Sequence, residues 1–218
     1  EERQAELLEC ARYFASLWKE RISQPPKSDL LSMMAHSDAT RDMDPKNFLG
    51  NLILLIVGGN DTTRNTLSGS IYALSQHPDQ YRKLRDNHDL IDSFVPEVIR
   101  WQTPLAHMRR TALEDIEFRG RQIRKGDKVV MWYPSSNRDE ETYEDPDRFD
   151  VTRNPDHQAF GGGGRHFCLG SALARLELRI LIEETLKRFP ATALDGTPAY
   201  AVSPFANQLK SLPVRLHG

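Results

Sequence analysis

The stretch FGGGGRHFCLGSALARLE, Phe160 to Glu177, contains four consecutive glycines and, after three further residues, a solitary cysteine. An apolar pattern with helical spacing begins directly after this cysteine. Glycine-rich loops before helices can bind phosphate, and a cysteine in this position can be a reactive thiol or a metal ligand. The segment therefore has three interpretations, among which the rest of the chain must decide.

A phosphate-binding loop fits these residues poorly. A Walker loop requires Lys followed by Ser or Thr after its last glycine, whereas Arg165 and His166 follow here. A dinucleotide fingerprint requires G-x-G-x-x-G directly after a strand, and the preceding DPDRFDVTRNPDHQAF has no convincing strand pattern. These departures disfavour nucleotide binding.

A catalytic thiol and a zinc site are disfavoured as well. Cys168 precedes a predicted helix, whose dipole favours the thiolate, but His166 is only two residues away, an awkward spacing for a catalytic pair. The other cysteine, Cys10, lies in an apolar helical pattern that predicts a packed side chain. No cluster of Cys, His or acidic residues has the spacing of a zinc site. A single thiolate at a helix N-terminus can instead be the axial ligand of a haem iron, with glycines that let the loop lie against a flat ring.

Composition excludes several broad classes of function. The 218 residues include 29 Lys and Arg against 31 Asp and Glu, so that the net charge of −2 gives no general attraction to nucleic acid or anionic membranes. The longest apolar run, LILLIV at residues 52–57, is too short to cross a bilayer, and no signal peptide is visible. We therefore expect a cytoplasmic protein without a membrane span or a nucleic-acid partner.

Hydrophobic periodicity predicts a mainly α chain with small β hairpins. Helices are expected over residues 3–22, in DLLSMMAHS, from 44 to about 76, over 79–87, over 90–101 and over 169–189. Asp44 is a good N-cap for the long helix, with Pro45 at its first position. The run MRRTALEDIEFRGRQIRKGDKVVMWYPSS predicts two or three strands, NRDEETYEDPDRFDVTRNP an ordered meander, and AYAVSPFANQLKSLPVRLHG a terminal hairpin.

The middle of the long helix contains VGGNDTTRN, residues 57–65. Two adjacent glycines cost about 2 kcal/mol relative to alanine inside a helix. They can be a tolerated kink or a place of close helix packing, or they can open the helix to a flat ligand. We favour the opening, because Asp61 and Thr62 follow Gly58 and Gly59 closely and would offer an acid and a hydroxyl there.

The segment PEVIRWQTP places Glu97 and Arg100 on one helix face. By itself this spacing indicates a surface ion pair contributing under about 1 kcal/mol. The neighbouring valines, isoleucine and tryptophan weaken this interpretation, and a buried pair would need further partners for the guanidinium. Arg148 in DPDRF is one candidate for such a partner.

Together, four segments resemble the cytochrome P-450 family of haem-thiolate monooxygenases, in the family's order. GGNDTT is similar to the central oxygen-activation helix, EVIR to the buried Glu-x-x-Arg pair, DPDRF to the meander motif whose arginine joins that pair, and FGGGGRHFCLG to the ligand loop. The resemblance covers essentially the whole chain but only about the C-terminal half of a family member. It implies that residues 1–218 form a single partial domain, the C-terminal part of the family's mainly α fold.

The resemblance implies roles for the matching residues. Cys168 corresponds to the proximal ligand of the iron of haem b, and Asp61 and Thr62 to the acid and threonine that deliver protons to dioxygen. The structural triad corresponds to Glu97, Arg100 and Arg148. Further cofactor contacts are implied for Gly58 and Gly59 beside the oxygen site, Arg110 and His166 at the propionates, Phe160 beneath the haem, and Gly170 in the ligand loop.

The resemblance also implies where a substrate would lie. Pocket residues are expected just after QTP and in the tail, where ordinary core is the alternative: Leu105, Ala106, Met108, Phe205 and Ala206. The ligand loop is one residue longer than the common pattern, because Phe160 lies eight residues before Cys168. This longer form resembles a bacterial subset that acts on lipids, sterols and related terpenoids.

The implied function is therefore hydroxylation of a small apolar lipid-, sterol- or terpenoid-like substrate, with dioxygen and electrons from a ferredoxin-type partner. The absence of the family's N-terminal half supports an alternative, a non-catalytic half-domain that binds a partner or cofactor without turnover. The isolated chain would leave one side of the haem uncovered, which argues against turnover in this form.

Overall fold

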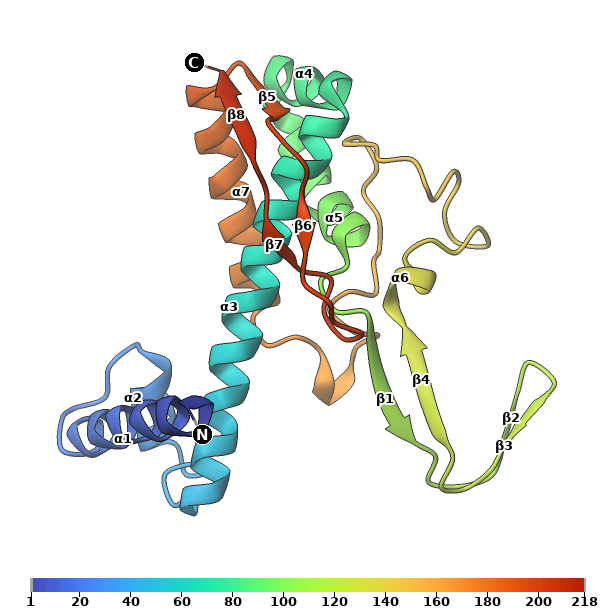
Figure 1. Ribbon diagram of the computed structural model, residues 1–218. Helices are drawn as coiled ribbons and strands as arrows, with labels where there is room; N and C mark the ends of the chain where they lie inside the picture. Colours follow the sequence, from blue (N-terminus) through green and yellow to red (C-terminus); the bar gives the residue numbers. More distant parts are fainter. Residues whose placement is uncertain (1, 218) are drawn as a thin grey trace. The chain divides into compact units, whose positions relative to one another are not determined.

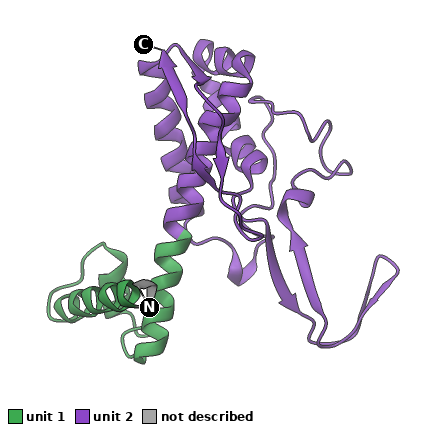
Figure 2. Cartoon of the chain, in the orientation of Figure 1, with its two compact units in different colours: residues 1–58 green, residues 59–218 purple. Residues whose placement is uncertain are grey.

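A computed structural model describes residues 2–217, and the chain divides into two compact units, residues 1–58 and 59–218 (Figure 2). The first unit contains α1 (Glu2–Ile22), α2 (Leu30–His36) and the beginning of α3 (Pro45–Gln76). The second unit contains the rest of α3 and all later elements. The single partial domain expected over residues 1–218 stays a prediction.

Helix caps and an ion pair between α1 and the N-cap of α2 help to shape the first unit. Asp29 caps α2 by accepting a hydrogen bond from the Ser32 backbone N–H at 2.8 Å, and the Arg21 side chain of α1 donates to the same carboxylate at 3.0 Å. Asp44 accepts from the backbone N–H groups of Lys46 and Asn47 at 2.9 and 3.0 Å, directly before Pro45. This confirms the predicted start of the long helix, because the cap satisfies N–H groups that lack a helical acceptor.

The second unit surrounds a hydrophobic core made by four helices and the meander. Its helices are the C-terminal part of α3, α4 (Pro78–Asp86), α5 (Ile91–Gln102) and α7 (Ser171–Arg188) (Figure 1). α5 packs directly against α7. The fully buried side chains at the centre include Leu74, Phe94, Phe149 and Ile182. The predicted helices are confirmed, and the meander contributes to the core as an ordered segment.

Helix α7 is apolar on two faces, and the chain buries only one of them. Leu178, Ile182 and Leu186 pack in the core. The stripe whose spacing predicted the helix stays between 49% and 83% exposed: Leu169, Leu173, Leu176 and Ile180. Periodicity therefore identified the helix but not the face that packs within this chain, because both faces carry leucine and isoleucine.

Four small antiparallel pairs complete the fold (Figure 1). In the middle of the chain β1 (His107–Thr111) pairs with β4 (Lys128–Trp132), and β2 (Ile116–Phe118) pairs with β3 (Arg121–Ile123), which makes four strands where two or three were expected. In the tail β5 (Ala191–Leu194) pairs with β8 (Val214–His217), and β6 (Ala199–Tyr200) with β7 (Leu209–Ser211). Short helices are η1 (His88–Leu90), α6 (Tyr133–Ser136) and η2 (Gly164–His166). The predicted class, mainly α with small hairpins, is confirmed.

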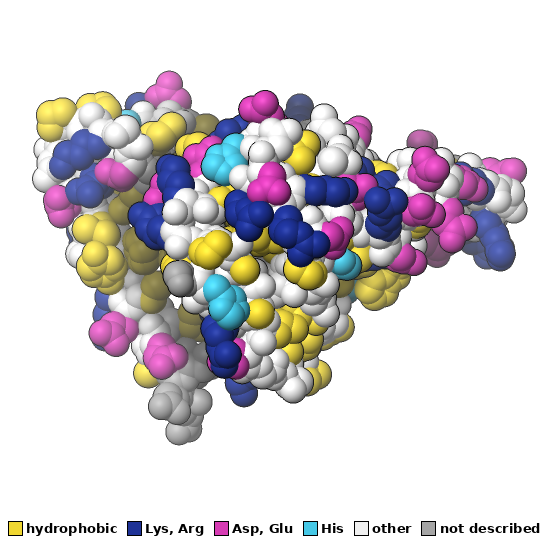
Figure 3. Space-filling model, turned by 90° about the horizontal axis from the view of Figure 1, so that it is seen from above, with side chains coloured by type: hydrophobic (Ala, Val, Ile, Leu, Met, Phe, Trp, Pro, Cys, Tyr) yellow, Lys and Arg dark blue, Asp and Glu magenta, His cyan; other side chains and the backbone are white. Residues whose placement is uncertain are grey.

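The surface agrees with the near balance of charge in the sequence. Figure 3 shows basic and acidic side chains interspersed on the visible face, with apolar side chains between them. Within residues 2–217, none of the helices combines the length and the apolar character needed to cross a membrane.

Candidate functional site

The loop that carries Cys168 is a closed turn shaped by glycines. The Cys168 backbone N–H donates to the Phe160 carbonyl at 3.0 Å, and the Phe167 N–H donates to the Gly164 carbonyl at 3.1 Å. Gly161, Gly163 and Gly164 have φ values of 89°, 98° and 74°, a region that side-chain-bearing residues rarely adopt. The glycines are therefore required by the turn that returns the chain to Phe160.

The thiol at the end of this loop is free and partly buried. Cys168 lies three residues before Ser171, the first residue of α7, so its sulfur belongs to the segment that leads directly into that helix. Apolar side chains next to it face outward, because Phe167 is 45% and Leu169 83% exposed. The site therefore combines one free thiol with apolar surface that nothing within residues 2–217 covers.

Aromatic and basic side chains support the loop from the inner side. The rings of His157 and Phe160 meet edge to face at 5.2 Å, and the Arg175 guanidinium lies 5.2 Å from the centre of the Phe160 ring. The two side chains hold Phe160 in place while its carbonyl receives the Cys168 N–H. Phe160 thus acts on the loop in this structure, and its place beneath a haem stays a prediction.

The imidazole of His157 is kept neutral by its surroundings. Burial, reinforced by the positive charge of Arg175, lowers the pKa of His157 from its ordinary value of 6.5 to about 4. The described residues offer neither ring nitrogen a hydrogen-bond partner. The folded protein therefore binds fewer protons than the unfolded chain when the pH lies between these two values.

The free energy of unfolding is expected to fall by about 3 kcal/mol as the pH is lowered from about 6.5 to about 4, because only the unfolded His157 becomes charged in this window. His157→Gln should remove most of this dependence, whereas His88→Gln, at an exposed position, should leave it unchanged. Urea denaturation at pH 7 and pH 4.5 measures the difference. Identical pH dependence in the His157 variant and the unmodified protein would contradict the assignment.

The glycine pair and the acid lie on an unbroken helix. α3 runs continuously from Pro45 to Gln76 through Gly58 and Gly59. A Cβ added at either glycine would meet nothing within 4 Å, so close packing within the described chain does not explain them. Asp61 and Thr62 are partly buried on the next turn, and Arg64 donates to the Asp61 carboxylate at 3.2 Å. The open space beside the two glycines would allow a ligand to approach the helix backbone there.

The two predicted propionate partners lie on different elements and are exposed. Arg110 is on β1, where its guanidinium donates to the Arg109 carbonyl at 3.0 Å. His166 ends the short helix η2 in the ligand loop. Gly170 is the N-cap of α7, with open space around the position of a Cβ. All three are accessible to a ligand, and their contacts with a cofactor stay predictions.

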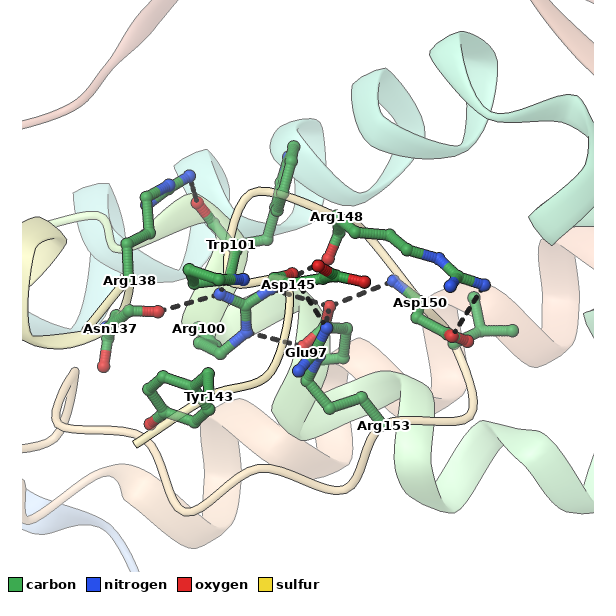
Figure 4. A network of polar contacts seen from close by, with 12 residues as sticks. Glu97, Arg100, Trp101, Asn137, Arg138, Tyr143, Asp145, Arg148, Asp150 and Arg153 are labelled. Atoms are coloured by element: carbon green, nitrogen blue, oxygen red, sulfur yellow. Dashed lines mark hydrogen bonds and ion pairs between the residues drawn. The ribbon is translucent and has the colours of Figure 1, made fainter. Parts of the chain in front are cut away.

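The Glu97–Arg100 pair is fully buried and saturated with partners (Figure 4). Arg100 donates from Nε and Nη2 to the two carboxylate oxygens of Glu97 at 2.7 and 2.8 Å. Its Nη1 donates to the carbonyls of Asn137 and Pro146 at 2.8 and 2.9 Å, and the Asp150 N–H donates to Glu97 at 3.0 Å. Because every charged atom has a partner, the pair anchors the meander to α5.

The expected role of the Arg148 side chain needs correction. Arg148 contributes only its carbonyl, which accepts from Arg100 at 3.3 Å, while its guanidinium is 58% exposed and pairs with Asp150 at 3.3 Å (Figure 4). Arg153 provides the third charge instead, with Nε 3.5 Å from Glu97 Oε1 and its side chain 18% exposed. The Asp150 N–H docked on Glu97 turns the chain so that the later arginine points inward. The second arginine of RFDVTR was the available sequence signal.

The predicted pocket residues come together from two distant segments. Leu105 and Ala206 form a β-bridge, and the Ala106 N–H donates to the Phe205 carbonyl at 2.8 Å. Met108 lies on β1 opposite Met131 and continues the same segment. Phe205 is 41% exposed, so these residues form an accessible apolar surface. Sequence reasoning missed the polar residues that hold this surface, Asn65, Gln102 and Asn207, because their partners are backbone groups far away in the chain.

The donor set fits haem better than a metal ion held by protein alone. Across residues 2–217 no group of three or more His, Cys, Asp or Glu side chains could hold a metal. A haem iron needs only one protein ligand, and Cys168 supplies one beside exposed apolar side chains. The residues present therefore fit a flat apolar macrocycle whose iron would be held by the sulfur of Cys168.

Comparisons with known proteins agree with this chemistry. A family model described as Cytochrome P450 matches residues 18–201. Linalool 8-monooxygenase of Pseudomonas putida is 43% identical over 192 residues, which cover 88% of this chain and 47% of that protein. Methyl-branched lipid omega-hydroxylase of Mycobacterium tuberculosis is 41% identical over 189 residues, with 85% and 44% covered.

Solved structures give the same result. Cytochrome P450-153 from Novosphingobium aromaticivorans has a TM-score of 0.91 and 47% identity to this chain, over 99% of this chain and 54% of its own. The chain spans about half the length of the curated relatives it matches.

Proposed function

The chain belongs to the cytochrome P450 family, and we propose that it provides the haem-ligand half of a monooxygenase. The proposed reaction is hydroxylation of a small apolar lipid-, sterol- or terpenoid-like substrate by dioxygen, with electrons from a ferredoxin-type partner. The single observation that carries this proposal is the free Cys168 thiol at the start of α7, in a glycine turn closed onto Phe160.

In this proposal the residues around Cys168 hold the cofactor. Bound haem would supply the iron at which dioxygen is activated. Cys168, three residues before the first residue of α7, would ligate that iron through its sulfur. Arg110 and His166 are exposed donors suited to the two propionates, and Gly58, Gly59 and Gly170 leave space for a flat ring.

Proton delivery would use the turn of α3 that follows the glycines. The carboxylate of Asp61 and the hydroxyl of Thr62 lie on consecutive residues of the helix, whose side chains do not face each other, so a proton taken up at the first would pass to the second through bridging water. Arg64 pairs with Asp61 at a partly exposed position, which places the carboxylate within reach of solvent. The chain would thus provide both the source and the final donor of protons.

The substrate proposal rests on the apolar surface formed by Leu105, Ala106, Phe205 and Ala206. Two relatives carry names that refer to linalool and to methyl-branched lipids. A surface of leucine, alanine and phenylalanine binds such molecules by removing apolar area from water. This chemistry selects apolar substrates as a class.

The decisive test uses the protein expressed from the complete reading frame that contains this chain. Reduction under carbon monoxide is expected to give the red-shifted band of a haem-thiolate protein, and binding spectra with fatty acids, terpenes and sterols should identify the substrate class. Absence of that band would overturn the proposal. A normal band without product from any bound substrate would instead support a half-domain that binds haem without turnover.

Thr62→Ala is expected to separate oxygen consumption from product formation. Removal of the final proton donor should lower the product formed per oxygen by about tenfold or more, while oxygen consumption changes much less. Thr63→Ala, on the next residue of α3, is the matched control and should keep the ratio of the unmodified enzyme. Simultaneous measurement of oxygen and hydroxylated product tests this, and an unchanged ratio in Thr62→Ala would contradict the relay.

A further inference from the structure

Asn65 is a buried amide that joins two parts of the second unit. Its side chain is 2% exposed and lies one helical turn after Asp61. Nδ2 donates to the Asp61 carbonyl at 2.7 Å, and Oδ1 accepts from the Leu209 backbone N–H at 3.1 Å. We propose that Asn65 is a positioning residue that holds the Asp61–Thr62 turn in register with the substrate-facing tail. The inference rests on the proposed function.

On the helix, side chains donate hydrogen bonds to the backbone carbonyls of both residues of the proposed proton relay, Asp61 and Thr62. A side chain that donates to the carbonyl four residues earlier shares that carbonyl with the helix ladder and tends to bend the helix. Asn65 does this to Asp61, and Thr66 Oγ1 does the same to the Thr62 carbonyl at 2.8 Å. Both peptide groups of the relay are therefore held by side chains one turn further on. Their orientation depends on these two side chains as well as on the helix.

The tail side of the link continues into the predicted pocket. Asn207, two residues before Leu209, donates from its side chain to the Gln102 carbonyl at 2.7 Å and from its backbone to the Pro104 carbonyl at 2.9 Å. The Phe205 carbonyl accepts from Ala106 at 2.8 Å. A displacement of the Phe205 segment by a substrate would therefore be transmitted to Leu209 through a short, hydrogen-bonded stretch of chain.

A second contact keeps the same elements close. A Cβ built on Gly69 of α3 would collide with Gln102 Oε1, so the Gln102 side chain lies directly against the helix backbone. Gly69 is one turn beyond Asn65 on α3, and Gln102 ends α5. Leu209 of the tail and Gln102 at the end of α5 thus both contact α3 within two turns of Asp61. Asn65 is the side chain that hydrogen-bonds both to the relay turn and to the tail.

In this proposal the position of the substrate-facing tail and the orientation of the Asp61 peptide both depend on the hydrogen bonds of Asn65. When the tail is in the position described, the Asn65 amide satisfies both backbone groups and the Asp61 carbonyl is held toward it. When the tail moves, Asn65 must break one bond or turn, which would re-orient the Asp61 peptide. Asn65 touches neither substrate nor cofactor in this proposal, and it acts only through Asp61 and Leu209.

Two substitutions distinguish the role of the Asn65 donor, Nδ2, from that of its acceptor, Oδ1. Asn65→Asp keeps an oxygen acceptor for Leu209 but removes the donor to Asp61, whereas Asn65→Ala removes both. Ser75→Ala is the matched control, since Ser75 lies on the same helix and its hydroxyl donates to Thr192 Oγ1 of β5 at 3.1 Å. The haem-loaded protein from the complete reading frame is used for product per oxygen, for amide hydrogen exchange at Leu209 and for thermal unfolding.

Asn65→Ala is expected to raise the exchange rate of the Leu209 amide roughly fivefold, as for loss of one hydrogen bond, and to lower product per oxygen several-fold. Asn65→Asp should keep the Leu209 protection yet lower product per oxygen to the same degree. Ser75→Ala should change neither quantity. This pattern assigns the effect to the donor end of Asn65.

Other outcomes overturn the inference. Unchanged exchange at Leu209 in Asn65→Ala would show that the link does not hold the tail, a result that needs no turnover. A normal haem-thiolate band with unchanged product per oxygen in a folded Asn65 variant would overturn the inference alone. An equal loss in Ser75→Ala would show a general structural effect. Absence of the band in the unmodified protein would overturn the proposed function instead, while the exchange comparison still reports on the link.

Discussion

Replacing Cys168 with alanine is expected to abolish the red-shifted carbon monoxide band of the reduced protein completely. The band depends on a thiolate bound to iron, and the chain has one other cysteine, Cys10 in α1. Cys168 is partly exposed and its loop is held by backbone bonds, so its truncation should change the free energy of unfolding of the haem-free protein by less than about 1 kcal/mol. Loss of the band would therefore report loss of the ligand and not loss of the fold.

Cys10→Ala is the matched control for this experiment. Cys10 is also free and partly buried, but it lies in a different compact unit from the ligand loop. The reduced Cys10→Ala protein should show the band at full intensity, and thermal unfolding of both variants in the haem-free form should match that of the haem-free unmodified protein. Survival of the band in Cys168→Ala would end the ligand assignment, and its loss in both variants would point to a general effect on folding.

Replacing Arg100 with methionine is expected to destabilise the protein by about 3–5 kcal/mol, the usual cost of leaving a buried charge without its partner. Glu97 would keep only the Asp150 N–H and the more distant Arg153 in a site without solvent. The carbonyls of Asn137 and Pro146 would lose their donor as well. A typical domain has only about 5–15 kcal/mol of stability, so much of the folded population would be lost.

Arg148→Met separates this effect from the general loss of an arginine in the same network. The Arg148 guanidinium is 58% exposed and pairs at the surface, so its removal should cost less than about 1 kcal/mol. Urea denaturation of the three proteins at pH 7 gives the comparison. If Arg148→Met were as destabilising as Arg100→Met, the buried triad would include the Arg148 side chain after all, and the assignment of Arg153 would be wrong.

Features that depend on neighbours in the chain were predictable from the sequence. The start of α3 follows from Asp44 and Pro45, since a cap and a preset φ act within one turn. The turn around Cys168 follows from consecutive glycines, three of which have positive φ. The apolar residues next to Glu97 and Arg100 weakened the interpretation of a surface ion pair, and the pair is buried. In each case the physical cause lies within a few residues of the feature.

Features that depend on distant partners were decided only by the tertiary structure. Two arginines five residues apart have the same chemistry, and the docking of Asp150 on Glu97 selects Arg153 over Arg148 for the interior. The periodicity of α7 cannot tell its core face from its exposed face, because both are apolar.

The sequence by itself predicts which residues would ligate a haem iron and relay a proton, because those predictions rest on single side chains and short motifs. Only the folded chain decided what holds them in place. Asn65 is an ordinary polar residue of a helix until Leu209, 144 positions later, offers it a backbone N–H. Hydrogen bonds and ion pairs have strict distance and direction requirements, which are met only after the distant segments have packed together.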